Sequence, residues 1–312
     1  MVSDRLMPTT TTMPSSRPAS PPRHSTLRLA TIVALGSGCV AGPPSGDAAE
    51  SQTSAEIVAA NGTSVNGTSV NGISINGISI NGVSASGMQL RGVAATGDNA
   101  GQAITGDDWI GAVLAAQLTN GTRLALRIDD TTMLPAPNSD IRSYAISYAT
   151  SDGWKPLCTN PEFGNQAIVF PGTWNLTTVR HQWDSNMFSL GCRGATFAKC
   201  VELGYKGDSL IDTYHAACVR AIRADYCGDG QSHTITGTEI NIYDKLGVQG
   251  DTQRWSTESN WTPDGATCIH IARVLTSLEE PNVPACIADR AQVECVSSGW
   301  PSRVLIRTEV NK

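Results

Sequence analysis

Apolar and polar side chains alternate along several short segments of the chain, a pattern typical of half-buried β-strands. Leu124, Leu126 and Ile128 alternate with arginine and alanine, and Asn120-Gly121 supplies a tight turn back to an apolar stretch. Further segments of this kind, or short apolar runs, cover residues 144–148, 167–170, 239–243 and 303–308. The pattern therefore predicts a mainly antiparallel sheet.

Two helical segments interrupt this pattern in the middle of the chain. The first covers residues 195–203, and the second follows Asp208, which is placed to cap a helix. In the second, four residues recur every four positions on one face: Leu210, Tyr214, Cys218 and Ile222. Sheet, two-helix insert and sheet again predict an α+β domain over residues 105–312.

The N-terminal residues have the features of an export signal. Arg23 and Arg28 precede a short apolar stretch that ends in small residues, which is typical of a signal peptide over residues 1–38. Cys39 resembles the lipidated cysteine of a bacterial lipobox, although Gly36 stands where that motif prefers leucine. Cleavage further on, which would remove Cys39, is the alternative. Residues 39–60 are expected to form a linker.

A five-residue repeat occupies residues 61–100. It begins NGTSV, NGTSV, NGISI, NGISI, NGVSA and continues more loosely, with glycine holding the register. A period of five matches neither a helix nor a strand, and it resembles pentapeptide-repeat β-solenoids. The departure is glycine after asparagine, where those repeats place a large apolar residue. The alternatives are thus a short solenoid or a disordered tether that spaces the domain from its anchor.

Cysteine usage indicates an oxidising compartment. Of nine cysteines, eight lie in the predicted domain, and none forms the close C-x-x-C pair typical of zinc ribbons or redox sites. We expect these eight to form four disulfides: Cys158, Cys192, Cys200, Cys218, Cys227, Cys268, Cys286 and Cys295. Their pairing stays open. The net charge of −6, without a basic cluster, argues against a nucleic-acid partner.

Several motifs between residues 224 and 268 resemble those of the ADYC domain family of exported bacterial proteins. The segment reads ADYCGDG, followed by SHT, GT, IYD and WTPDGATC. The resemblance implies an exported domain, often behind a lipobox, with no assigned activity. The expected location is the bacterial envelope, as an outer-membrane lipoprotein or periplasmic protein, or outside the cell.

The candidate catalytic residues are Asp225, Asp229 and His233. Two carboxylates and a histidine could divide acid and base roles or hold a metal. In the competing structural interpretation, Asp225 pairs with Arg220 or Arg223 and Asp229 closes an Asx turn over Gly230. Calcium is conceivable at residues 229–232, but the spacing and bidentate glutamate of an EF-hand loop are missing, and no metal or other cofactor is predicted.

The candidate binding residues lie near tryptophans in the last third of the chain. Exposed Trp255 or Trp261 could stack on a sugar, with Glu239 and Asp244 nearby in sequence, whereas core packing is the alternative. The leading hypothesis is a non-enzymatic binding or structural module with a carbohydrate or protein ligand, attached to a membrane through lipid on Cys39. The alternative is an exported hydrolase, possibly metal-assisted, that uses Asp225, Asp229 and His233.

Overall fold

The computed structural model describes fourteen stretches of the chain, all within one compact unit that begins at Ala48. They are residues 64–65, 68–70, 80–85, 88–91, 93–99, 102–118, 122–175, 178–184, 186–206, 210–235, 237–274, 283, 285–296 and 298–312. The predicted signal peptide, the linker, Cys39, Asp208 and the turn at Asn120-Gly121 lie outside these residues.

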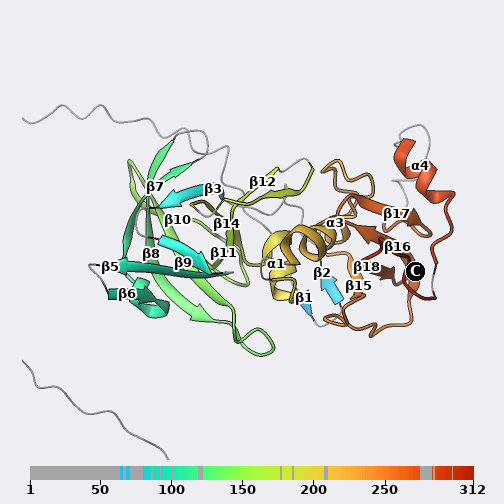
Figure 1. The fold of residues 1–312 in the computed structure, drawn as a ribbon, viewed down its shortest axis with the longest axis horizontal. Coiled ribbons are helices and arrows are strands. Elements are labelled where there is room, and N and C mark those ends of the chain that lie inside the picture. Colours follow the sequence, from blue (N-terminus) through green and yellow to red (C-terminus); the bar gives the residue numbers. More distant parts are fainter. Residues whose placement is uncertain are drawn as a thin grey trace, which may run out of the picture. The chain divides into compact units, whose positions relative to one another are not determined.

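Six antiparallel strands form a closed ring (Figure 1). In spatial order they are β9 (Arg142–Thr150), β11 (Ala167–Pro171), β14 (Phe188–Cys192), β3 (Ile80–Ala85), β7 (Val113–Leu118) and β8 (Arg123–Met133). Pairing of β8 with β9 closes the barrel, and β10 (Gly153–Pro156) extends from β9. Leu114, Ala116 and Leu118 of β7 are buried while their neighbours are exposed, as the alternating pattern requires.

Three short strands form a meander that contacts the barrel. They are β4 (Met88–Arg91), β5 (Ala94–Asn99) and β6 (Gln102–Thr105), followed by the 3-10 turn η1 (Gly106–Trp109). Ala95 of β5 donates its amide to the Tyr144 hydroxyl at 3.0 Å and accepts from the Trp109 indole at 3.3 Å. Both aromatic side chains belong to the barrel core, so the meander is fastened to that core.

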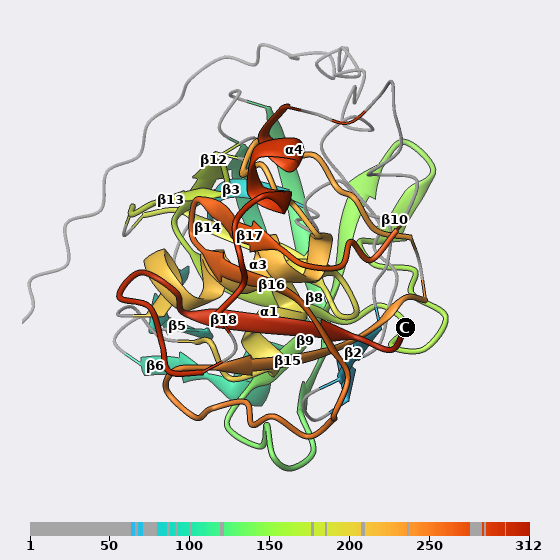
Figure 2. The same cartoon turned by 90° about the vertical axis from the view of Figure 1, so that its right-hand side faces the viewer.

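A second, open sheet has six strands. Its order is β1 (Ser64–Val65), β2 (Thr68–Val70), β15 (Glu239–Asp244), β18 (Ile306–Val310), β16 (Ser256–Thr262) and β17 (Gly265–Ile269). Figure 2 shows β15, β18, β16 and β17 side by side in this order. The strands are antiparallel, and β15 and β18 pair over Asn241 to Asp244.

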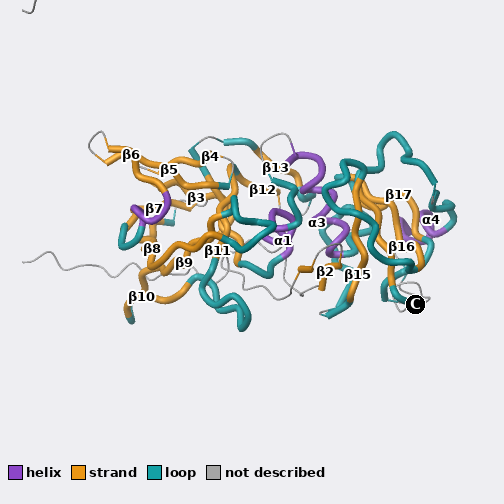
Figure 3. The backbone as a smooth tube through the Cα atoms, turned by 90° about the horizontal axis from the view of Figure 1, so that it is seen from below, coloured by secondary structure: helices purple, strands orange, loops and turns teal. Residues whose placement is uncertain are grey.

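Helical elements follow or interrupt the strands. They are α1 (Thr196–Glu202), the π-helical turn η2 (Ile211–His215), α3 (Ala216–Arg223) and the later α4 (Ala285–Ala291). Helix α3 packs on β16, β17 and β18, α4 packs on β17, and α1 lies against α3 and the barrel strand β14. Figure 3 shows α3 beside these strands, and Cys218 and Ile222 of α3 share a core with Trp261 and Ile306. The predicted helical face therefore points into the core, since Cys218 has no exposed surface.

The mainly antiparallel pairing and the small helical content are confirmed. The strands divide into a closed barrel and an open sheet with separate cores, a division that the alternating pattern did not predict. Strand β8 closes the barrel, because its eleven residues pair with β7 along one edge and with β9 along the other. Alternation along one strand reveals its two faces but not its neighbours.

The period-five segment supplies paired strands where it is described. Its residues form β1 and β2 in the open sheet, β3 in the barrel, and β4 and β5 in the meander. Strand β3 lies between β14 and β7, so the ring is completed by residues 80–85. The domain boundary at residue 105 stays a prediction.

All eight cysteines of the domain form disulfides, as expected. The pairs are Cys158–Cys192, Cys200–Cys218, Cys227–Cys286 and Cys268–Cys295, with Cα atoms 5.3 to 5.9 Å apart. The second joins α1 to α3, and the third joins the ADYC segment to α4. Four disulfides indicate an oxidising environment outside the cytoplasm.

Removing the Cys227–Cys286 disulfide is expected to cost the most loop entropy, because it closes the largest sequence separation, 59 residues. For such a loop the chain-entropy estimate is about 4 kcal/mol. We expect the variant with both cysteines replaced by alanine to lose about this much free energy of unfolding in urea titrations. Both proteins should carry Cys39→Ser, so that the two differ only in cysteines of the domain. An unchanged urea midpoint would contradict this role.

Lys199 of α1 is predicted to make stability depend on pH. The side chain is buried, and burial lowers the pKa of Lys199 to about 7, although Glu202 and Glu162 oppose this shift. Between pH 7 and about 10 the unfolded chain therefore binds more protons than the folded protein, so stability rises with pH by up to about 1.4 kcal/mol per unit. Urea titrations at pH 6 to 9 should show a flatter profile for Lys199→Met. The exposed Lys155→Met serves as control; parallel profiles for all three proteins would refute the prediction.

Candidate functional site

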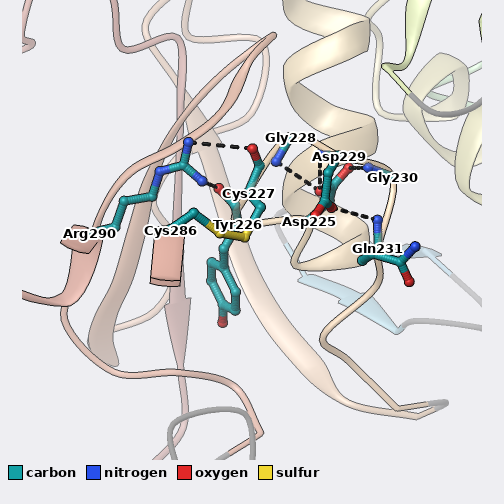
Figure 4. The surroundings of a disulfide bond; sticks show 9 residues. All are labelled: Asp225, Tyr226, Cys227, Gly228, Asp229, Gly230, Gln231, Cys286 and Arg290. Carbon is teal, nitrogen blue, oxygen red and sulfur yellow. Dashed lines mark hydrogen bonds between the residues drawn. A yellow bond between two sulfur atoms is a disulfide. The ribbon is translucent and has the colours of Figure 1, made fainter. Parts of the chain in front are cut away.

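The Asp225 carboxylate organises the turn that follows α3. The helix ends at Ala224, whose φ of 50° is left-handed, and the Asp225 amide donates back to the Arg220 carbonyl at 2.9 Å. One carboxylate oxygen accepts from the amides of Gly228 and Asp229 at 2.9 and 3.2 Å, and the other accepts from Gly230 at 3.0 Å (Figure 4). The turn is thus wrapped around a buried carboxylate.

Arg220 supplies the countercharge for this carboxylate. Its guanidinium, which is almost fully buried, pairs with Asp225 and donates to the carbonyls of Pro263 and Thr178. Burial raises the pKa of Asp225, and the charge of Arg220 opposes that rise. Because three amides and the guanidinium donate to its two oxygens, they favour the ionised form of Asp225, and we assign it a structural role.

Tyr226 connects the turn to a buried ion pair. Its hydroxyl donates to Glu258 Oε1 at 2.6 Å and accepts from the Arg273 amide at 3.1 Å. The Arg273 guanidinium donates to both carboxylate oxygens of Glu258, at 2.9 and 2.7 Å. The tyrosine ring lies 5.4 Å from that of Trp261 at an angle of 18°, and burial raises the pKa of Tyr226 well above its usual value. Tyr226 is therefore a core residue.

Cys227 fastens the turn to α4. Besides the disulfide with Cys286, Arg290 of the same helix donates to the carbonyls of Tyr226 and Cys227 (Figure 4). Gly228 has a φ of 72°, and a Cβ there would overlap the Asp264 carbonyl. Each residue of the motif therefore has its own structural role. Ala224 ends the helix, Asp225 closes the turn, Tyr226 packs in the core, and Cys227 forms the disulfide.

Asp229 and His233 are arranged differently from Asp225. Asp229 is exposed, and its carboxylate accepts from the Gln231 amide at 2.9 Å, which is the expected Asx turn. His233 is half-buried with its ring 5.8 Å from that of Tyr226; burial lowers its pKa, and Asp229 and Asp225 oppose this. Its Nε2 atom is buried and finds no hydrogen-bond partner among the described residues.

No direct hydrogen bond joins the three candidate catalytic side chains where the chain is described. Nor does any group of three or more histidine, cysteine, aspartate or glutamate side chains lie suitably placed for a metal ion within the same residues. Asp225 faces into the turn, while Asp229 lies at the surface. Asp225, Asp229 and His233 are therefore close in sequence and lie near one turn, but their side chains do not converge on a shared site.

Asp244 closes a second turn of the same kind. It ends β15, and its carboxylate accepts from the amides of Leu246, Val248 and Gln249 at 2.7, 3.2 and 2.6 Å. The Tyr205 hydroxyl donates to it at 2.9 Å. With four donors around a buried carboxylate, Asp244 has a structural role, and this corrects its selection as a binding residue.

Trp261 is also placed away from solvent. Its side chain has no exposed surface, and its indole donates to the Thr308 hydroxyl at 2.8 Å. Stacking of this ring on a sugar is excluded in this structure, because the ring already packs in the core beside Tyr226. Glu239 begins β15 and is exposed, and Trp255 is half-buried beside the same sheet.

One face of the open sheet carries polar side chains on β15 and β18, most of them buried. Asn241 lies across from Glu309, and Tyr243 lies across from Arg307, so the four side chains share one face. Glu309 accepts from the Asn241 amide at 3.1 Å and from the Tyr243 hydroxyl at 3.3 Å. We call these four residues the polar face.

Two half-buried tryptophans lie at the polar face. The Trp255 amide donates to Glu309 at 3.3 Å, and the Trp300 ring lies under the Arg307 guanidinium at 4.5 Å and edge-on to Tyr243 at 6.2 Å. Sequence reasoning selected Trp255 but missed Trp300, Arg307 and Glu309. The alternation of polar and apolar residues over 306–310 and 239–244 could have indicated two strands that each carry one polar face.

These features define a class: a disulfide-linked, mainly antiparallel β domain with a short helical insert and a carboxylate-centred turn. The chain belongs to the ADYC domain family, whose sequence model matches residues 106–275. The suspected resemblance is therefore confirmed. No curated protein and no solved structure matches the chain. None of the helices in the described residues is both long enough and apolar enough to cross a membrane.

Proposed function

We propose that this protein is an exported, lipid-anchored envelope component that binds carbohydrate through the polar face. In this proposal the ADYC turn maintains the domain and takes no part in chemistry. The signal peptide directs export, Cys39 carries the lipid, and the linker of residues 39–60 separates the anchor from the domain. The four disulfides support the export step, since they persist in oxidising compartments.

The observation that carries the proposal is the pair of half-buried tryptophans beside the polar face. Sugars present both apolar ring faces, which stack on indoles, and hydroxyl groups, which bond to amides, carboxylates and guanidinium groups. Trp255 and Trp300 supply the first kind of contact, and the half-buried Tyr243 hydroxyl supplies the second. Asn241, Arg307 and Glu309 are themselves buried and support these three residues. Their own mutual hydrogen bonds hold the polar groups in place before a ligand arrives.

Binding can be measured with the mature chain on immobilised envelope polysaccharides and on a glycan array. We expect Trp255→Ala and Trp300→Ala each to weaken binding at least about tenfold, the loss of one good contact. Trp154→Ala is the matched control, because Trp154 is 39% exposed on β10 and packs on Arg127 instead. Equal binding by all four proteins would reject the polar face as the ligand site.

The anchor and the hydrolase alternative need separate measurements. Cys39→Ser should release the protein from membranes, and continued membrane attachment would contradict lipidation. Turnover of an ester, amide or phosphoester substrate that disappears in His233→Ala, with folding intact, would favour a hydrolase over the binding module. The polar-face variants should leave such turnover unchanged, so the outcomes can be told apart.

A further inference from the structure

A short hairpin presents a buried histidine between two aromatic rings. The strands β12 (Thr173–Asn175) and β13 (Arg180–Gln182) pair with Trp174 directly opposite His181. The His181 side chain is only 1% exposed. Its ring centre lies 4.8 Å from that of Trp174 and 5.6 Å from that of Trp183, and Trp183 is 57% exposed.

Both ring nitrogens of His181 face hydrogen-bond acceptors. Nδ1 lies 2.9 Å from Asp212 Oδ1, and Nε2 lies 2.8 Å from the Pro171 carbonyl oxygen. A carbonyl and an ionised carboxylate accept but do not donate, so each nitrogen must carry a proton for both bonds to exist. The doubly protonated ring is the imidazolium cation.

The surroundings suit a cation at this position. Indole faces attract positive charge, and two indoles lie within contact range of the ring. Gly172 has a φ of 71°, and a Cβ there would lie 2.6 Å from His181 Nε2. Glycine thus leaves room for the ring to reach the Pro171 carbonyl.

The charged groups around His181 come from several segments. Asp212 is on η2, and its side chain is 66% exposed. His215, the last residue of η2, is fully buried; burial lowers its pKa to about 4, with His181 acting in the same direction, so it adds no competing charge near neutrality. Arg180 pairs with Asp264, and Asp184 accepts from the Asn186 amide at 2.8 Å. Asp212 is therefore the carboxylate that serves as the hydrogen-bond and charge partner of His181.

We propose that His181 is a pH-sensitive latch, whose imidazolium holds the 173–182 hairpin to η2 and is released on deprotonation. A neutral ring keeps one proton and loses one of the two bonds. Histidine changes charge between about pH 5 and 8, a range that an exported protein can meet outside the cytoplasm. Because η2 leads directly into α3, the latch connects the exposed Trp183 to the helix that carries Cys218. This proposal is independent of carbohydrate binding.

The test uses the full-length protein labelled with 15N-histidine. Long-range 1H–15N spectra at pH 5.5 should show both His181 nitrogens protonated, and spectra at pH 8 should show one. Hydrogen exchange of the hairpin amides, corrected for intrinsic rates, should be about tenfold faster at pH 8 than at pH 5.5, matching the loss of a charge-assisted bond. A single proton on the ring at pH 5.5, or equal protection at both pH values, would overturn the latch.

Two variants identify the partner of His181. Asp212→Asn removes the charge with little change of size, so it should abolish the tenfold difference in hairpin exchange between the two pH values. His270→Gln removes an exposed histidine elsewhere and should leave the difference intact. If Asp212→Asn behaves like wild type, the carboxylate is not the group that retains the proton, and the proposed latch is wrong.

Discussion

Asp225→Asn is expected to lower the free energy of unfolding by about 3 to 5 kcal/mol, the usual effect of breaking a buried ion pair. The amide nearly matches the carboxylate in size but carries no charge, so Arg220 is left buried without its countercharge. It also turns one acceptor oxygen into a donor, which then faces a backbone amide of the turn. Urea titrations followed by far-UV circular dichroism measure the loss.

Asp229→Asn is the matched control for this variant. It makes the same chemical change four residues further on, where the side chain is exposed and an asparagine oxygen can close the same Asx turn. We expect a change of less than about 0.5 kcal/mol, as for ordinary surface substitutions. If both variants lowered the free energy of unfolding equally, the buried ion pair of Asp225 would not be the reason for its loss.

The local chemistry of the ADYC turn was predictable because its partners are close in sequence. Asp225 and Arg220 are five residues apart, and Asp229 bonds to an amide two residues away. Short-range hydrogen bonds of this kind follow from residue type and spacing alone. The structural interpretation of both carboxylates could therefore be reached from the sequence.

The long-range partners could not be predicted in this way. Arg220 also contacts the carbonyls of Thr178 and Pro263, and backbone carbonyls look the same in every sequence. Eight cysteines indicate four disulfides, but their pairing depends on which elements meet. Cys227 bonds to Cys286 only because α4 returns to the turn, and the helix carries no signal of that contact.

The same limit explains the errors at the binding residues. Tryptophan near polar residues in sequence suggested exposure, yet Trp261 belongs to the core-facing side of β16, opposite Ile306 on β18. Trp255 and Trp300 each contact a different residue of β18, which lies more than fifty residues from Trp255 in the chain. The polar face is thus a product of strand order, which periodicity within one strand does not encode.

Strand order also creates the buried ion pair of Glu258 and Arg273. Neither side chain has exposed surface. Arg273 grips Glu258 through two nitrogens and donates to the carbonyls of Ala221 and Ile222 at 2.7 and 2.8 Å. These carbonyls belong to the last turn of α3, where the Ala224 amide also donates to Ala221, at 3.2 Å, and Ile222 depends on Arg273. The guanidinium therefore serves both as countercharge and as helix cap.

Arg273→Met is accordingly expected to cost about 3 to 5 kcal/mol, because the Glu258 carboxylate keeps only the Tyr226 hydroxyl among the described residues and the Ile222 carbonyl loses its donor. The double variant Arg273→Met, Glu258→Leu removes both charges and should recover much of that loss, since apolar replacements of a buried pair are often near neutral. Part of the loss should persist in the double variant, because the Ile222 carbonyl stays without the donor that Arg273 supplied. Urea titrations of the wild type, both single variants and the double variant give the coupling energy. A double variant whose loss equals the sum of the single losses would show that the two charges do not depend on each other.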